Sequence, residues 1–342
     1  MFQETALHLA KTACPSIAWR IRKEIFREDC TSPGMRDLQK RILEEPEVMR
    51  ILSLQKEDGW LGGLFHGTDE PESGIRYLME KGVESSHPAV QAALQAIEKR
   101  GADFDLGSMQ RVGKHLDAWH LGGSKLIKAC VFAYAGEENH DFVREGIGEA
   151  LNAFRFVCNV SRMEDVYESY KDKKVFRSGV LWPCVYHLRL LAITKGWRTA
   201  ENQTMLAQAV SRLSELSPIP EIKLLNKGQV IGPASVFMYN FHDDMAALTD
   251  AGWMMWFHRT QMLASLGVAH QAEAIRYQLE YVSRMVKESG GLFTKPLRHA
   301  YFVRWSQYVG LALEEDWKTK DRRVNDLTFR WLLIQFHASQ DE

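Results

Sequence analysis

The stretch that decides the fold runs from Tyr186 to Leu213, YHLRLLAITKGWRTAENQTMLAQAVSRL. Its first part would be apolar on nearly every side of a helix, and its second part has one polar face, with Gly196 and Trp197 between them. A helix that is apolar all round must be buried all round, whereas an amphipathic helix covers a core with one face. The stretch therefore predicts a helical hairpin with an inner and an outer helix.

The same pairing of helices recurs along the chain. Breaks at Gly136 and Gly267 separate similar pairs, and Pro88 and Gly101 are typical of a helix start and a helix stop. The predicted helices are 4–26 and 35–55, 71–81 and 88–100, 115–135 and 140–157, 178–195 and 199–216, 244–266 and 269–288, and 299–314 and 323–338. A repeat of about 50–60 residues favours six pairs closed into a double ring, an all-α (α/α)6 toroid that forms a single domain over residues 1–342. A superhelical solenoid is the alternative.

Composition argues against several classes of protein. The 342 residues are 45% hydrophobic and 25% charged, which is ordinary for a globular chain, and a net charge of −1 argues against nucleic-acid binding. The five cysteines are widely spaced without a CxxC pair, so neither a disulfide framework nor a cysteine-based zinc site is expected. No apolar run reaches about 18 residues and no signal-peptide pattern opens the chain, so we expect no membrane span and a cytoplasmic location.

One motif carries a family resemblance. In LQKEDGWLGG, residues 54–63, the residues Gln55, Asp58, Gly59 and Trp60 resemble the repeat of squalene cyclases and protein prenyltransferase β-subunits, and a weaker echo lies at ESGGLFTKPL, residues 288–297. The resemblance implies a toroid of the terpenoid-cyclase-like superfamily. It also implies that the motif braces neighbouring helix pairs, because in that family Gln and Asp bond to helix ends and Trp stacks on them. His66, just beyond the motif, is expected near the mouth of the ring.

The resemblance also implies where an acid and a metal would stand. Cyclases of this family carry an Asp-x-Asp-Asp motif, and in FHDD, residues 241–244, Phe241 replaces the first Asp while Asp243 falls on the position of the acid. Prenyltransferases bind zinc through an Asp-x-Cys pair and a distant His, but this chain offers only Cys184 and His187, three residues apart. We therefore expect no metal and no other cofactor.

The loops before the inner helices hold the candidate site residues. His120 follows Asp117 by three positions, a spacing at which helical side chains meet. The candidate catalytic residues are Asp243, Asp244, His242, His66, Asp117 and His120. The candidate substrate-binding residues, mostly aromatic, are Trp119, Trp182, Tyr239, Trp256, His299, Tyr301 and Trp305. Aromatic faces stabilise carbocations and stack on sugar rings. The alternatives are helix caps for the histidines and acids, a surface turn for residues 298–299, and core packing for the aromatics.

Three functions stay open at this point. The first is acid–base chemistry, of lyase or isomerase type, on a small and mainly apolar isoprenoid-like substrate with Asp243 as the acid. The second is a carbohydrate-active hydrolase or lyase, which needs two carboxylates across a cavity, such as Asp243 with Asp117 or Glu72. The third is a non-enzymatic toroid that binds a hydrophobic molecule or a protein. The expected partner is a small-molecule substrate, and homo-oligomerisation is left open.

Overall fold

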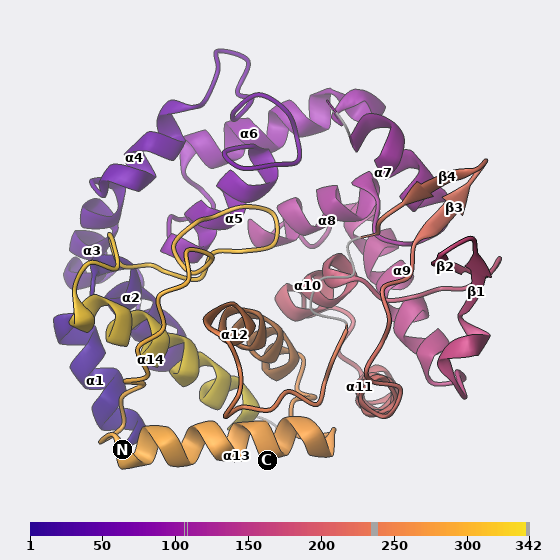
Figure 1. The fold of residues 1–342 in the computed structure, drawn as a ribbon. Coiled ribbons are helices and arrows are strands. Elements are labelled where there is room, and N and C mark those ends of the chain that lie inside the picture. Colours follow the sequence, from indigo (N-terminus) through magenta and orange to yellow (C-terminus); the bar gives the residue numbers. More distant parts are fainter. Residues whose placement is uncertain (106, 108, 234–238, 340–342) are drawn as a thin grey trace. The chain divides into compact units, whose positions relative to one another are not determined.

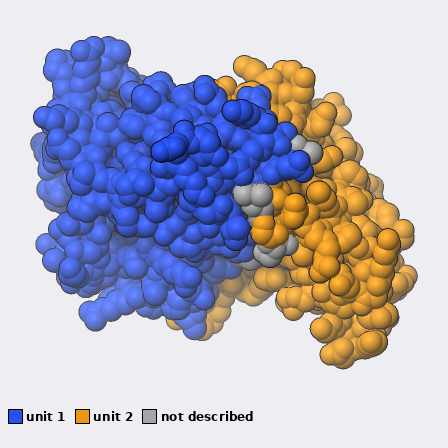
Figure 2. Space-filling model, turned by 90° about the horizontal axis from the view of Figure 1, so that it is seen from above, with its two compact units in different colours: residues 1–104, 248–258, 280–339 blue, residues 105–247, 259–279, 340–342 orange. Residues whose placement is uncertain are grey.

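The computed structural model describes residues 1–105, 107, 109–233 and 239–339. Helices make up 56% and strands 5% of the structure, which confirms the all-α class. The described chain forms two compact units, which Figure 2 distinguishes by colour. Unit 1 comprises residues 1–104, 248–258 and 280–339, and unit 2 comprises residues 105–247 and 259–279. The single toroid domain therefore stays a prediction.

Unit 1 is built from short helices punctuated by proline. Its elements are α1 (Phe2–Thr12), α2 (Pro15–Arg20), a π-helical turn (Ile21–Ile25), α3 (Pro33–Leu43), α4 (Pro46–Ser53), α5 (Pro71–Lys81), α6 (Pro88–Lys99), a 3-10 turn (Gly101–Asp103) and α14 (Lys320–Ala338). Helices α2 to α6 each begin with proline, whose missing N–H is not needed in a first turn. An apolar core joins α1, α2 and α14 through Leu9, Ile17, Phe329 and Leu333.

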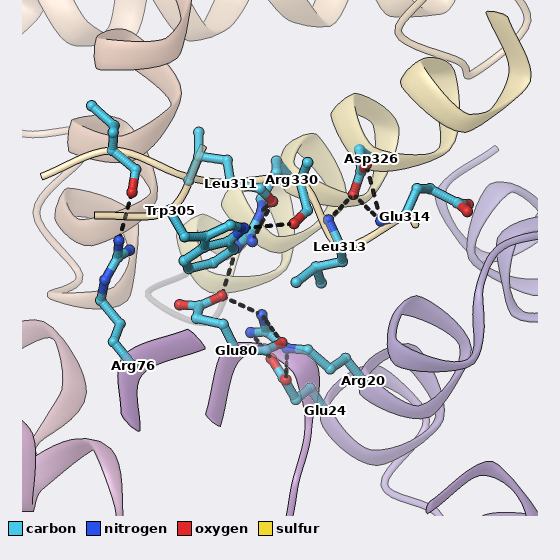
Figure 3. A network of polar contacts seen from close by, with 12 residues as sticks. Arg20, Glu24, Arg76, Glu80, Trp305, Leu311, Leu313, Glu314, Asp326 and Arg330 are labelled. Carbon is cyan, nitrogen blue, oxygen red and sulfur yellow. Dashed lines mark hydrogen bonds and ion pairs between the residues drawn. The ribbon is translucent and has the colours of Figure 1, made fainter. Parts of the chain in front are cut away.

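A buried ion network holds the C-terminal part of unit 1 against α2 and α5 (Figure 3). The Glu80 carboxylate accepts from Arg20 Nη1 at 2.7 Å and from Arg330 Nη1 at 2.9 Å. Burial raises the pKa of Glu80, but the charges of Arg330 and Arg20 outweigh it and hold that pKa far below its usual range. Glu80 is paired with Arg20 and Arg330, and Arg20 is also paired with Glu24. We therefore interpret Glu80 as a structural residue.

Unit 2 shows the helical layering that the opening stretch predicts. Its elements are α7 (Met109–Ala118), α8 (Ser124–Tyr134), α9 (Asp141–Val157), a 3-10 turn (Met163–Asp165), α10 (Val185–Ile193) and α11 (Ala200–Glu215), with strands β1 (Tyr167–Tyr170), β2 (Lys173–Phe176), β3 (Leu224–Asn226) and β4 (Gln229–Ile231). Helices α8 and α10 pack on each other and on α9, and α11 packs on α9 (Figure 1). Residues 185–191 of α10 are all buried, whereas α11 buries one face. A buried helix followed by an amphipathic helix is thus present, as the stretch predicts, whereas their places in an inner and an outer ring stay a prediction.

Two helices contribute residues to both units. They are α12 (Asp250–Ser265) and α13 (Glu273–Glu288), which change unit after His258 and after Leu279 respectively. The small sheets are antiparallel hairpins, with Tyr167 opposite Phe176 in one and Leu224 opposite Ile231 in the other. Within the described residues, no helix combines the length and the apolar character needed to cross a membrane.

The predicted helix 299–314 is wrong, and buried cations explain why. Arg76 Nη2 donates to the carbonyls of Ser306 and Val309, each at 2.6 Å, and Arg330 Nη2 donates to the carbonyl of Leu311 at 2.6 Å. Carbonyls that would accept bonds within a helix therefore accept them from side chains of α5 and α14. The segment forms turns and coil despite its helix-like apolar pattern.

Other predicted helices exist with different limits. Helix 4–26 is interrupted before Pro15, helix 35–55 before Pro46, and helix 115–135 by a turn in which Gly122 has φ +79°. Helix 178–195 begins only at Val185, after extended backbone. The four short strands had no clear alternating pattern in the sequence and were not predicted.

Candidate functional site

The motif that carries the family resemblance is a brace within unit 1. Gln55 Nε2 donates to the carbonyl of Ala89 at 2.7 Å, at the start of α6, and Asp58 pairs with Arg100 at 3.0 Å, just past the end of α6. The Arg100 guanidinium lies 3.9 Å from the centroid of the Trp60 ring, which is fully buried. The motif therefore fastens one loop to both ends of a helix, with Arg100 rather than Gln55 or Asp58 lying over the Trp60 ring.

His66 lies in the same unit and pairs with an acid. Its Nδ1 is hydrogen-bonded to the Glu72 carboxylate, and both side chains are largely buried. The ring of Tyr308 lies 6.0 Å from that of His66, centroid to centroid. His66 therefore belongs to a unit other than the one that holds Asp117, His120, His242, Asp243 and Asp244.

The three candidate residues of the FHDD segment, His242, Asp243 and Asp244, form hydrogen bonds or ion pairs within unit 2. Asp243 Oδ2 lies 2.6 Å from Nη2 of Arg259, which is itself buried. His242 Nε2 is hydrogen-bonded to the carbonyl of Ser214 at 2.8 Å, and Asp244 accepts from the N–H of Ala246 at 3.0 Å. In the structure, Asp243 is thus one half of an ion pair with a buried arginine.

The aromatic candidates are divided between the two units. Trp182 is buried in unit 2, and Trp119 and Tyr239 are half-buried there. In unit 1 Trp256 is buried against Trp253, with ring centroids 5.5 Å apart. The unit also contains His299 and Tyr301, with ring centroids 4.3 Å apart, and Trp305, which lies under the Arg76 guanidinium. As a group, these aromatic residues do not line any one described cavity.

One groove in unit 2 does bring predicted residues together. It has a volume of about 460 Å³ and is lined by Asp117, His120, Lys125, Glu145, Gly148, Glu149, Asn152, Ala153 and Leu181. Asp117 lies in the last turn of α7 and His120 lies in the turn that follows, while Glu149 and Gly148 come from α9. The predicted helical pairing of Asp117 and His120 is wrong, because α7 ends at Ala118, but the turn that follows still places both side chains at the groove.

A tight turn between α7 and α8 positions these residues. The Asp117 carboxylate accepts from the N–H of Lys125 at 3.1 Å, in the first turn of α8. A Cβ on Gly123 would lie 2.2 Å from the carbonyl oxygen of Gly113 and 2.3 Å from Asp117 Oδ1, so only glycine fits. His120 has φ +53°, a left-handed conformation that is uncommon outside glycine. Strained backbone of this kind is often found at functional sites.

Glu149 lies between two imidazoles. Its Oε2 is 3.2 Å from Nδ1 of His120, and its Oε1 is 3.4 Å from Nε2 of His187. His187 is fully buried, and its Nδ1 accepts from the backbone N–H of Cys184 at 2.9 Å. Burial lowers the pKa of His187, but Cys184 and Glu149 outweigh it and raise that pKa to about 9. With Nδ1 accepting, Nε2 is the nitrogen that carries a proton and donates to Glu149. The buried imidazole therefore orients a carboxylate that lines the groove.

The two carboxyl groups of the groove have pKa values shifted in opposite directions. Burial raises the pKa of Asp117 to about 6, with a contribution from the charge of Glu149 and against the Lys125 hydrogen bond. Burial also raises the pKa of Glu149, but His187 and His120 outweigh it and leave that pKa below its usual value. One carboxyl group is thus prepared to hold a proton near neutral pH and the other to stay ionised.

The sequence did not indicate that Glu149 and His187 belong to this site. Glu149 was not singled out, because its approach to α7 depends on the packing of α9. His187 stood out only as a partner of Cys184 for zinc. In the described part of the chain, no three His, Cys, Asp or Glu side chains gather so as to hold a metal ion.

Comparison with known proteins identifies no relative. The chain matches no family model, no curated protein and no solved structure.

Proposed function

We propose that the protein is an enzyme that uses general acid–base catalysis on a small, polar, sugar-like substrate in the unit 2 groove. The observation that carries the proposal is the opposite shift of the pKa values of Asp117 and Glu149, which line one groove. Pairs of titratable groups with separated pKa values are the usual arrangement for an acid and a base that act together. This is the carbohydrate-active alternative, with Glu149 in place of Asp243.

Within this proposal, Asp117, Glu149 and Lys125 each have a separate role. Asp117, with a pKa of about 6, is about one-tenth protonated at pH 7 and donates a proton to the leaving oxygen. Glu149 accepts a proton from water or from a substrate carbon, and His187 holds it in place. Lys125 adds a positive charge for an anionic group. Six of the nine lining residues have polar side chains that can hydrogen-bond to hydroxyl groups, while apolar atoms form most of the exposed surface of the groove.

An isoprenoid-like substrate acted on by Asp243 stays a prediction. Asp243 and His242 border a larger groove of about 610 Å³, whose other lining residues are mainly polar, including Glu215, Gln271 and Arg276. Asp243 is one half of an ion pair, with its Oδ2 lying 2.6 Å from Nη2 of the buried Arg259. Neither observation supports protonation of an alkene, and so the Asp117 groove is the better-supported site.

Activity screening with matched variants tests the proposal. The wild-type protein would be assayed on aryl glycosides, oligosaccharides and uronate-containing oligosaccharides, and Asp117→Asn and Glu149→Gln would be assayed on any substrate that reacts. We expect each variant to lose about 10²–10⁴-fold in kcat. Glu145→Gln is the control, because Glu145 lines the same groove on α9 but has no place in the proposed proton transfer. A folded Asp117→Asn protein with full activity would remove this site from consideration.

A second test of the proposal blocks the groove with a larger side chain. A Cβ on Gly148 would meet no atom within 4 Å, so Gly148→Ala should fold and stay active. Gly148→Leu extends a side chain into the groove and should raise KM or abolish activity. Equal activity of these two variants would show that the substrate binds elsewhere.

A further inference from the structure

A second cavity, in unit 1, has a lining of unusual charge. It has a volume of about 370 Å³ and is lined by Arg298, His299, Val303, Trp317, Lys318 and Arg323. Residues 298–303 belong to the segment of turns and coil that precedes α14, whereas residues 317–323 lead into α14 and form its first turn. Cationic side chains from two separate segments therefore converge on one small cavity.

Every polar side chain that lines this cavity is a hydrogen-bond donor. Arg298, Lys318 and Arg323 carry only N–H groups at their ends. His299 Nδ1 accepts from the backbone N–H of Tyr301 at 3.1 Å, so neutral His299 carries its proton on Nε2 and donates there as well. No Asp or Glu belongs to the lining. The cavity is thus suited to an acceptor with negative charge.

Among the described acids near this cavity, Asp316 forms a long ion pair with Lys318, and Asp250 and Asp326 contact groups other than the cationic side chains. Asp250 accepts from the backbone N–H of Arg298 at 2.7 Å, and Asp326 accepts from Trp317 Nε1 at 2.7 Å. Asp316 lies 2.6 Å from Arg322, which does not line the cavity, and 3.6 Å from Lys318. In the described part of the chain, neither Arg298 nor Arg323 has a carboxylate within ion-pair distance.

Such a gathering of like charges is unfavourable unless an anion neutralises it. One of the cations is fixed in place, since Arg323 Nη1 donates to the carbonyl of Trp317 at 2.5 Å. The positive N-terminal end of the 19-residue helix α14 adds to the potential. Trp317, stacked on Phe302 with ring centroids 4.8 Å apart, and Val303 supply an apolar wall.

From this geometry we infer that the cavity binds the phosphate group of a small soluble molecule. A doubly charged phosphate offers several acceptor oxygens to the donors of Arg298, His299, Lys318 and Arg323, and the remainder of the ligand packs on Trp317 and Val303. The volume admits a group of this size but no folded macromolecule. This inference does not depend on the proposed acid–base function, because the residues belong to the other unit.

Isothermal titration with inorganic pyrophosphate tests the site on the full chain. We expect saturable one-to-one binding that weakens with added salt. Lys318→Gln and Arg298→Gln should each lower the affinity about tenfold, since each removes a charge-assisted hydrogen bond. Both side chains are exposed, so the variants should fold, which circular dichroism would verify. Lys320→Gln is the matched control, because it removes the same charge in the first turn of α14 from a residue outside the lining, and it should bind like the wild type.

Three results would overturn the inference. One is the absence of pyrophosphate binding at low salt, and another is an equal loss of affinity in Lys320→Gln and Lys318→Gln, which would indicate a diffuse surface charge. The third concerns the source of the phosphate. Binding to vesicles that contain phosphatidic acid, without binding to pyrophosphate, would indicate a membrane surface in place of a soluble ligand.

Discussion

The pKa of a buried carboxyl group is lowered in the ion network of unit 1 and raised in the groove of unit 2. Glu80 has two arginine partners, and its pKa lies far below the usual range. Asp117 has a backbone N–H and a neighbouring acid, and its pKa rises to about 6. Burial favours the neutral form of both groups, so the nearby charges make the difference. The first arrangement stabilises a fold, whereas the second keeps a proton available for transfer.

The two regions also differ in what their polar side chains contact. In the network, Arg330 and Arg76 bond to backbone carbonyls of residues 306–311 and so hold a segment that has no regular structure of its own. In the groove, the side chains of Asp117, His120 and Lys125 line open space. Variants in the two regions should therefore change stability with opposite sign.

The largest expected effect is that of Arg330→Met. The substitution leaves the carbonyl of Leu311 without its donors and Glu80 with one arginine partner fewer, so we expect a loss of about 3–5 kcal/mol in the free energy of unfolding. Urea denaturation followed by circular dichroism measures it.

Arg322→Met is the control for that substitution. Arg322 lies on the same helix and pairs with Asp316 and Glu315 at the surface, so its loss should leave the denaturation midpoint nearly unchanged. Equal midpoints for the two variants would contradict a stabilising role of the network.

Two glycines on one helix sharpen the claim that the groove is open. A Cβ on Gly146 would lie 3.0 Å from a Leu190 methyl and 3.1 Å from Ala129 Cβ, so Gly146→Ala should destabilise the protein by about 1–3 kcal/mol through overpacking. Gly148→Ala meets open space and should stabilise α9 by about 0.5–1 kcal/mol. The two unfolding free energies check this, and a destabilised Gly148→Ala protein would show that the groove is filled.

Local patterns in the sequence predicted those parts of the molecule that local interactions determine. The buried helix α10 and the amphipathic helix α11 follow from apolar periodicity, and the contacts of Gln55, Asp58 and Trp60 join parts of the chain that are close in sequence. Asp117 and His120 were selected because they lie at the predicted start of an inner helix, three residues apart. The Glu149–His187 pair was missed because it forms only when α9 packs on α10. The helix predicted over 299–314 is absent for a related reason, because Arg76, more than 200 residues away in the chain, donates hydrogen bonds to carbonyls of this segment.

The effect that distinguishes the two regions most directly is that Asp117→Asn should stabilise the protein. The folded state binds the Asp117 proton more tightly than the unfolded state does, so this residue's contribution to stability is complete below pH 4 and is lost as the pH rises to about 6. Asparagine has no charge to bury and can still accept the Lys125 hydrogen bond. After allowance for solvent at this half-buried site, the variant should be about 1 kcal/mol more stable at pH 7.5 and no more stable at pH 4. Urea denaturation at both pH values measures the difference, and a variant less stable at pH 7.5 would place Asp117 with the structural charges of unit 1.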